Sequence, residues 1–371
     1  MINKNVYLFL FIFLSTIIVI FIHKKDLITF LSNKNKKNLI IGYVFNYHWE
    51  KVRNYFISLA KVGIKNCDIV IFVKGMSEET LEKIKSLGVI IYPIPDYPKL
   101  KPNSHRWEVY LNFLLENKDK YNLVFTTDIR DTIFQKDVFQ LYESNKPFLG
   151  VFLEDLLLNE KVNKDWVLDL CNETEFNNYF DKKPVICGGT LIGTIDKFIE
   201  FCQEFMKIVL ETKANDQGIL NYIIYYKKDF NDCLIATDNS GNVMTIGFSD
   251  RMKLNFDNDD NILNFNGQIP AAVHQYTRHK DIAAKISKKF NITDFNFSYY
   301  KEEHQNIRIF SKEINKKIFI IIFVVIIFIN IIFISSKFIK KIQKRKENFR
   351  KVKIKQSKKK KSLKKYRYIK I

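Results

Sequence analysis

Residues 122–131, NLVFTTDIRD, form an apolar, β-rich run that leads directly into two acids. Other runs of strand length and composition precede it at residues 38–47, 68–73 and 89–94. Segments with helix caps or helical spacing of apolar residues lie between these runs, at residues 50–62, 77–87 and 104–118. Continuous apolar strands that alternate with helices are typical of a parallel sheet covered on both faces. The sequence therefore predicts an α/β fold in this part of the chain.

The basic charge of this 371-residue chain is concentrated at its C-terminal end. The net charge is +20, and residues 337–371 contain 18 Lys and Arg against one acid. The remainder is close to neutral, which removes the main argument for nucleic acid as the partner of the folded part. The tail is either a surface for anionic lipid headgroups or a solvated end. The abundance of aromatic residues excludes a wholly disordered chain.

Two long apolar segments frame the chain, at residues 6–22 and 318–334. Each is just long enough to span a bilayer as a helix. The first lacks a small-residue cleavage site, so we favour an uncleaved anchor over a signal peptide, with a buried core helix as the other alternative. We expect an N-terminal anchor and stem in residues 1–36 and a second transmembrane helix at 318–334. The membrane is therefore an expected partner.

The basic tail, residues 335–371, indicates how these spans are oriented. Segments rich in Lys and Arg stay on the cytosolic side of a membrane. Two spans then place residues 37–310 in the lumen or on the exterior, and we expect the lumen of the Golgi or endoplasmic reticulum. Lys24 and Lys25, which follow the first span, oppose this orientation, but the tail carries the larger bias.

Asp128 and Asp131 stand at the carboxyl end of the expected fourth strand, where a parallel sheet presents its ligand site. Two carboxylates that converge on one point repel each other unless a cation lies between them. Hard divalent ions prefer such oxygen ligands and also bind phosphates. The pair is therefore a candidate metal site. The alternative is an Asx turn with a salt bridge to Arg130.

Gly188 and Gly189 interrupt a β-rich run at residues 186–193. Glycine inside a strand often marks the close approach of a ligand, and a β-bulge is the alternative explanation. Further along, Asn215 or Asp216 can cap a helix.

Residues 272–279, AVHQYTRH, combine an apolar strand end with several polar side chains. Here His274 can supply an imidazole to a metal ion, and Arg278 can supply a cation to a phosphate. A structural histidine is the alternative. No Cys-x-x-Cys occurs among the five cysteines, which argues against a zinc ribbon.

Taken together and in this order, these segments resemble those of nucleotide-sugar glycosyltransferases of the GT-A fold. The likeness is greatest to eukaryotic membrane-anchored members with T-D-x-R-D and H-Q-Y-x-R-H segments, and it extends from about Leu39 to Asp281. It implies a GT-A-like, Rossmann-type catalytic domain at residues 37–310, with a mixed, mainly parallel sheet and helices on both faces.

The resemblance implies a divalent cofactor. Asp128, Asp131 and His274 match the ligands of a Mn²⁺ (or Mg²⁺) ion that bridges the two phosphates of the donor. The family usually has Asp-x-Asp, whereas this chain has Asp-x-x-Asp. We therefore keep a second hypothesis, a non-catalytic, membrane-anchored binding protein that retained the fold and lost the chemistry.

The resemblance also assigns substrate contacts. Gly188 and Gly189 match the strand beneath the donor sugar, and Asp216 and Gln217 match residues that touch the donor or the acceptor. An inverting enzyme needs a carboxylate base for the acceptor hydroxyl. Asp216 is our candidate for that base. Its rivals are Glu154 and Asp155.

Two arginines complete the expected site. Charge grows on the leaving nucleoside diphosphate as the sugar bond breaks, and a cation such as Arg278 would stabilise it. Arg106 is a plausible second cation, with a surface salt bridge as the alternative. We therefore expect a metal-dependent, hexosyltransferase-like enzyme of the secretory pathway. It would move a sugar from a nucleotide-sugar donor to a glycan, protein or lipid acceptor.

Overall fold

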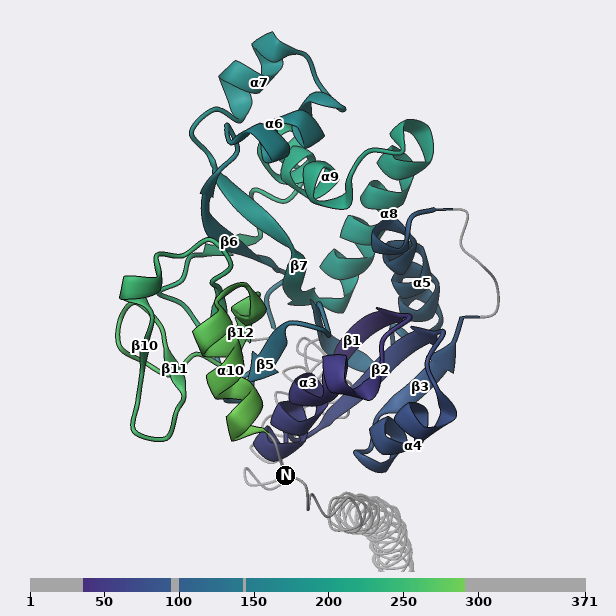
Figure 1. The fold of residues 1–371 in the computed structure, drawn as a ribbon. Helices are drawn as coiled ribbons and strands as arrows, with labels where there is room; N and C mark the ends of the chain where they lie inside the picture. The colour runs from purple at the N-terminus through teal and green to yellow at the C-terminus, as the bar shows by residue number, and fades with distance from the viewer. Residues whose placement is uncertain (1–35, 95–99, 143–144, 291–371) are drawn as a thin grey trace, which may run out of the picture. The chain divides into compact units, whose positions relative to one another are not determined.

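The computed structural model describes residues 36–94, 100–142 and 145–290 (Figure 1). These residues all belong to one of the two units into which the chain divides, Met1–Lys301. Within the three ranges, no helix is both long enough and apolar enough to cross a membrane. The two apolar segments and the basic tail lie outside the described residues, so the anchor, the second span and their orientation stay predictions.

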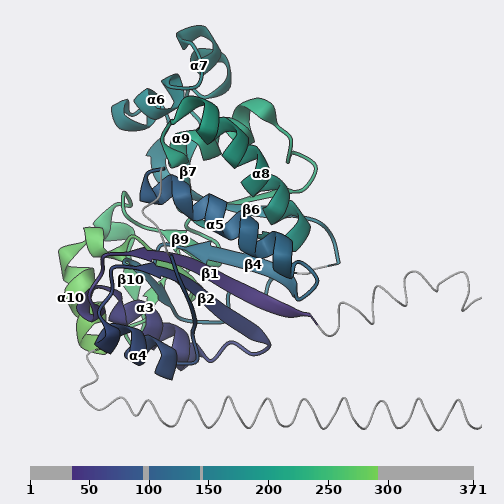
Figure 2. The same ribbon diagram turned by 90° about the vertical axis from the view of Figure 1, so that its right-hand side faces the viewer.

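A seven-stranded sheet forms the centre of the described part (Figures 1 and 2). Its strands, in spatial order, are β3 (Ile90–Pro93), β2 (Cys67–Lys74), β1 (Lys37–Phe45), β4 (Tyr121–Thr127), β7 (Pro184–Thr194), β6 (Leu149–Leu157) and β8 (Leu234–Thr237). Neighbouring strands are parallel except at β7, which is antiparallel to β4 and to β6. The prediction of a mixed, mainly parallel sheet is confirmed.

The first half of the sheet is built from strand–helix units, as the apolar pattern predicts. Its helices are α3 (Trp49–Val62), α4 (Glu78–Ser86) and α5 (Pro102–Asn117). Ser77 caps α4 by accepting a hydrogen bond from the Thr80 backbone N–H. Gly63, with φ 59°, ends α3 in the left-handed conformation that favours glycine.

Helices cover both faces of the sheet (Figure 2). On one face, Trp107 of α5 packs against Phe201 and Phe205 of α8 (Ile195–Thr212), with ring centroids 5.2 and 5.3 Å apart. On the other face, Tyr55 of α3 and Ile84 of α4 are buried in a separate cluster. Burial of each such apolar side chain contributes about 1.5–3 kcal/mol, so these two layers stabilise the sheet from both faces.

A second, three-stranded sheet lies beside the first. It consists of β5 (Thr132–Phe134), β12 (Ala272–His274) and β9 (Val243–Thr245), with β12 in the middle. Helix α10 (Lys280–Lys289) covers it through Ile282 and Ile286. Residues 264–281 lack a regular apolar period apart from the strand end read in residues 272–279, yet both β12 and the start of α10 fall inside this segment.

A group of short helices lies next to strands β6 and β7 of the central sheet (Figure 1). It contains α6 (Lys161–Leu168), α7 (Glu173–Tyr179), α9 (Asp216–Tyr222) and the π-helix η1 (Ile223–Lys227). Asn221 of α9 is fully buried and joins this group to β7, because its amide both accepts from and donates to the backbone of Ile186.

Candidate active site

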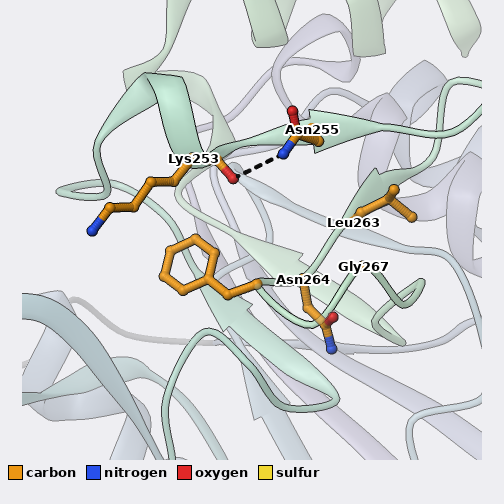
Figure 3. Close-up of a pocket in the computed structure, with 6 residues that line it drawn as sticks. Lys253, Asn255, Leu263, Asn264 and Gly267 are labelled. Carbon is orange, nitrogen blue, oxygen red and sulfur yellow. Dashed lines mark hydrogen bonds between the residues drawn. The ribbon is translucent and has the colours of Figure 1, made fainter.

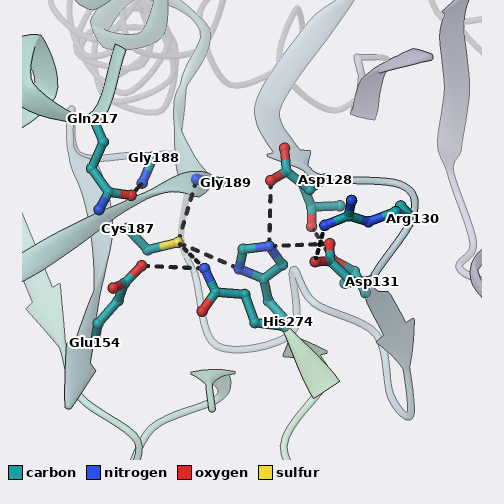
Figure 4. Close-up of polar contacts among 12 residues, drawn as sticks. Asp128, Arg130, Asp131, Glu154, Cys187, Gly188, Gly189, Gln217 and His274 are labelled. Carbon is teal, nitrogen blue, oxygen red and sulfur yellow. Dashed lines mark hydrogen bonds and ion pairs between the residues drawn. The ribbon is translucent and has the colours of Figure 1, made fainter. Parts of the chain in front are cut away.

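Strand register brings Asp128, Asp131 and His274 together (Figure 4). Asp128 directly follows β4, and its N–H donates to the carbonyl of Gly189 on β7 (2.9 Å). Asp131 directly precedes β5, which pairs with β12 so that His274 lies opposite Thr132. The turn between β4 and β5 therefore places both acids beside the end of β12.

These three side chains form a compact group of potential metal ligands. One ligand atom from each lies within 4.8 Å of the other two. His274 Nε2 is 3.5 Å from Asp128 Oδ2 and 3.5 Å from Asp131 Oδ1. His274 Nε2 and Asp131 Oδ1 are buried and have no hydrogen-bond partner among the described residues. Buried polar atoms without partners are costly, so this donor set fits a divalent cation.

Gly189 leaves the space in which this group forms. A Cβ atom at position 189 would lie 2.4 Å from His274 Cε1 and 2.7 Å from Asp128 Oδ2. Real Cβ atoms do not approach other atoms so closely. At Gly188 a Cβ would meet Gln217 at an ordinary 3.4 Å. The groups that approach Gly189 belong to the chain itself, and the close approach of a ligand at this glycine pair stays a prediction.

Arg106 of α5 links the acids to β7. Its guanidinium donates to Asp128 Oδ1 (2.6 Å), to Asp216 Oδ2 (2.7 Å) and to the Gly188 carbonyl (2.7 Å). The Arg106 side chain is only 11 % exposed, so the alternative of a surface salt bridge is wrong. Asn215 caps α9, which leaves Asp216 free to pair with Arg106.

Burial and charge act in opposite directions on the ionisable groups of this site. Burial raises the pKa of Asp216 above its usual value, although Arg106 opposes the shift. Burial also acts to raise the pKa of Asp128, but the charges of Arg106 and His274 outweigh it and hold that pKa well below its usual range. Asp128 is therefore a carboxylate at neutral pH.

A cavity of about 370 Å³ opens beside the group. Its lining combines aromatic rings, an amide, two arginines and both acids: Tyr43, Phe45, Tyr47, Pro102, Asn103, Arg106, Asp128, Ile129, Arg130 and Asp131. Arg130 donates to Asp131 Oδ2 (3.2 Å), and its side chain is 54 % exposed. The cavity thus offers flat apolar faces and positive charge next to the candidate metal ligands.

Several residues that were predicted to belong to the site make other contacts in the structure. The guanidinium of Arg278 lies over the ring of Phe248 (4.4 Å), and Arg278 does not line the cavity. Asp155 accepts hydrogen bonds from Ser249 and Asn239, which tie β6 to the chain beyond β8. Glu154 is buried and accepts a hydrogen bond from Gln275 (3.3 Å). Gln217 holds the Gly188 N–H through its Oε1 (3.0 Å).

The structure adds residues that sequence reasoning did not single out. Tyr43 and Tyr47 line the cavity, at the end of the first strand, where a sheet of this kind was expected to present its site. Cys187 lies 3.4 Å from His274 Nδ1. Sequence analysis names Arg130 only as the partner of a salt bridge; that salt bridge, to Asp131, is present, and the structure adds the place of Arg130 in the cavity lining.

A second cavity, of about 440 Å³, lies against the hairpin of β10 (Asn255–Phe256) and β11 (Ile262–Leu263) (Figure 3). Among its lining residues only Lys253 has an ionisable side chain. The Asn264 amide is occupied by backbone groups, because it donates to the carbonyls of Ser240 and Gly241. This cavity therefore lacks the groups that catalysis needs.

Comparison with solved structures gives distant likenesses of fold. No protein-family model and no curated protein matches the chain. The galactosyltransferase LgtC in complex with donor and acceptor sugar analogues matches 68 % of this chain and 96 % of its own at 14 % identity, with a TM-score of 0.41. An active-site mutant of LgtC matches 71 % and 95 % at 12 % identity, with a TM-score of 0.42. At such scores the likeness carries no conclusion about chemistry.

Proposed function

We propose that this chain is a glycosyltransferase that takes a sugar from a nucleotide-sugar donor and uses a divalent metal ion. The observation that carries the proposal is the group Asp128, Asp131 and His274 at the carboxyl end of β4, in which two buried atoms, His274 Nε2 and Asp131 Oδ1, make no hydrogen bond to any described residue. The resemblance in sequence order and the mixed sheet agree with it. Donor sugar and nucleotide are not specified by these observations.

Asp128, Asp131 and His274 would hold the ion, Mn²⁺ or Mg²⁺. When bound, such an ion stabilises the negative charge that develops on the phosphates of a leaving nucleoside diphosphate. Gly189 keeps the three ligands close by leaving out a side chain. Arg106 orients Asp128, because its guanidinium fixes Oδ1 and leaves Oδ2 on the side of His274.

The cavity supplies the remaining contacts for such a donor. Aromatic faces stack on nucleobases, and Tyr43 and Tyr47 provide such faces. Arg130 provides an exposed cation that suits the planar, bidentate recognition of phosphate. Asp216, fixed beside Gly188 by Arg106, is our candidate carboxylate for the sugar hydroxyls. Arg278 would contribute only if Phe248 releases it.

The cellular setting remains part of the proposal. The two apolar segments and the basic tail support a membrane-anchored enzyme with its catalytic part in the Golgi or endoplasmic reticulum lumen. In that compartment the acceptor would be a glycan, a protein or a lipid, and the transferred group a hexose.

The test is turnover of a panel of UDP- and GDP-sugars by the full chain, with and without Mn²⁺. We expect Mn²⁺-dependent release of nucleoside diphosphate from at least one donor. Loss of that release in Asp131→Asn and His274→Ala would support the site. Mn²⁺-dependent binding of nucleotide without any turnover would favour the non-catalytic hypothesis, and full activity of both variants would refute the metal assignment.

A further inference from the structure

One Asn-x-Ser/Thr triplet lies among the described residues, at Asn172-Glu173-Thr174, where α7 begins. Such a triplet, a sequon, is the acceptor sequence for N-glycosylation, and it has to lie at the surface to carry a glycan. All three of its residues are exposed. The sequon therefore meets the first requirement for modification.

The fold uses only one end of the Asn172 amide. Asn172 has an extended backbone (φ −85°, ψ 168°), and its Oδ1 accepts a hydrogen bond from the Glu175 N–H (3.0 Å). Its Nδ2, the atom to which a glycan is attached, makes no hydrogen bond to any described residue. Glycosylation replaces one hydrogen of Nδ2 and leaves Oδ1 an acceptor. A modified Asn172 can therefore still cap α7.

Other contacts hold the start of α7 without using Asn172 Nδ2. The Asn172 N–H donates to Glu175 Oε2 (3.1 Å), and Glu175 Oε1 accepts from the hydroxyl of Tyr226 on η1 (2.9 Å). Glu173 forms an ion pair with Lys164 of α6 (3.1 Å). A glycan on Nδ2 thus requires no rearrangement of the folded chain.

Helix α7 lies apart from the candidate active site. It is at the outer edge of the group of short helices, and strands β6 and β7 lie between it and the smaller sheet in Figure 1. None of the residues from 172 to 179 lines the cavity beside the candidate metal ligands. A glycan at the start of α7 therefore leaves that cavity open.

We propose that Asn172 is an N-glycosylation site of this chain. In this reaction Asn172 Nδ2 forms a bond to C1 of the first sugar of a lipid-linked oligosaccharide pyrophosphate. The bond from C1 to the pyrophosphate oxygen breaks, the lipid pyrophosphate leaves with the electron pair, and Nδ2 loses one proton. Sequons are modified in the lumen. The proposal therefore rests on the proposed luminal position of residues 37–310, but not on the reaction proposed for this chain.

The test uses the full chain, produced in eukaryotic cells and extracted from their membranes. Peptide N-glycosidase in H₂¹⁸O converts a glycosylated asparagine into an aspartate that carries ¹⁸O. Trypsin then releases residues 165–182, and we expect their fragment spectrum to place the label at position 172. Asn177 and Asn178 lie in the same peptide outside any sequon, so they report the label that spontaneous deamidation adds.

Asn172→Asp separates the glycan from the helix cap, because a carboxylate still accepts from the Glu175 N–H but has no amide nitrogen. This variant should run one glycan smaller than wild type in electrophoresis, and after deglycosylation both should unfold at the same temperature. Thr174→Ala should lose the same glycan, and Thr174→Ser should keep it. Asn178→Asp changes another exposed asparagine of α7 and should keep every glycan.

The chain has two further sequons, at Asn291 and Asn296, outside the described residues. Glycans are therefore counted relative to wild type, and the ¹⁸O label identifies the position. Label at position 172 in Thr174→Ala at the level of wild type would contradict modification through the sequon.

Protection from protease in sealed microsomes separates the possible failures. Absence of label at position 172, in chains whose residues 37–310 are protected, would overturn the proposal for Asn172 alone. Absence of label together with digestion of residues 37–310 would refute the glycosylation site and the luminal position together. Label at position 172 without turnover of any nucleotide-sugar would support the site and count against the proposed enzyme function.

Discussion

Position 189 has room for a hydrogen atom and for nothing larger, because His274 and Asp128 occupy the place of a Cβ atom. Gly189→Ala should push the imidazole away from the acids. We expect Mn²⁺ affinity to fall at least tenfold and the free energy of unfolding to fall by about 1–3 kcal/mol from overpacking. Calorimetry and urea denaturation measure these two changes.

Gly188→Ala is the matched control for that prediction. The two glycines are adjacent in β7, but a methyl group at position 188 would meet Gln217 at an ordinary contact distance of 3.4 Å. Mn²⁺ affinity should stay close to that of wild type. Equal loss of affinity in the two variants would contradict the specific role of Gly189.

The guanidinium of Arg106 forms ion pairs with two acids, Asp128 and Asp216. Replacing it by Ala leaves Asp216 buried without its cationic partner and Asp128 without one of its two. Removing one member of a buried ion pair costs about 3–5 kcal/mol, and we expect a loss of that size in urea denaturation. Arg106→Lys should recover only part of it, because an ammonium cannot bind both carboxylates and the Gly188 carbonyl in the same planar geometry.

Arg251→Ala tests whether that loss is specific to burial. Arg251 also pairs with an acid, Asp281, but its side chain is 42 % exposed. Exposed ion pairs contribute about 0–1 kcal/mol, so the variant should be nearly as stable as wild type. A similar loss for Arg106→Ala and Arg251→Ala would show that burial of the ion pair does not matter.

At the scale of single residues, part of the candidate site could be predicted from the sequence. Asp128, Asp131 and His274 could be predicted because each follows or precedes an apolar strand and because their order resembles a family. Cys187 and Gln275 could not, since their contacts depend on how β7 and β12 lie side by side in space. The position of Arg278 on Phe248 was equally inaccessible, because residues 248 and 278 are adjacent only in the folded chain.

Asn221 controls how α9 is attached to the central sheet. Its amide satisfies both the N–H and the carbonyl of Ile186, where the pairing of β6 with β7 is irregular. Asn221→Ala leaves these backbone groups buried without partners, at a cost of about 1–3 kcal/mol for each. We expect a large fall in the midpoint of thermal unfolding. Since α9 begins at Asp216, nucleotide-sugar turnover should fall as well.

Asn266→Ala is the control for this element. Asn266 is exposed, and its amide makes a single bond of 3.3 Å to the Ser240 carbonyl. Loss of this hydrogen bond should change the midpoint of thermal unfolding very little. A midpoint for Asn221→Ala equal to that of Asn266→Ala would mean that α9 does not depend on this attachment.

The helices and strands predicted from the sequence agree with the structure where the chain alternates long apolar strands with helices. The strands and helices from β1 to β4 lie within a few residues of their predicted positions, since each has an apolar pattern or a cap that marks its boundaries. After β4 the pattern is weaker. Strands β5, β9 and β12 have three residues each, too few for a period to be recognised, and β7 reverses direction within the sheet.

Binding of a metal ion should stabilise the described part as a whole, because its ligands come from both sheets. A ligand at 100 times its Kd adds about 2.7 kcal/mol to the stability of a folded protein. We therefore expect Mn²⁺ to raise the midpoint of thermal unfolding by several degrees and EDTA to reverse the effect. Asp131→Asn should show no such rise, and a rise equal to that of wild type would count against this group as the ion's binding site.

The proposed orientation in the membrane can be tested on the complete chain. Sealed microsomes should protect residues 37–310 from added protease, because they would lie in the lumen. A tag placed after residue 371 should be digested, since the basic tail would be cytosolic. Digestion of the 37–310 region before detergent is added would reverse the orientation.

The middle position of β12 in the smaller sheet has a consequence for the order of synthesis. A ribosome makes the whole seven-stranded sheet, through Thr237, before it reaches residues 272–274. Until then a nascent chain has the two carboxylates but no imidazole. Completion of the candidate site is thus delayed until nearly all of the described residues have been translated, so a nascent chain would not hold the proposed ion before that point.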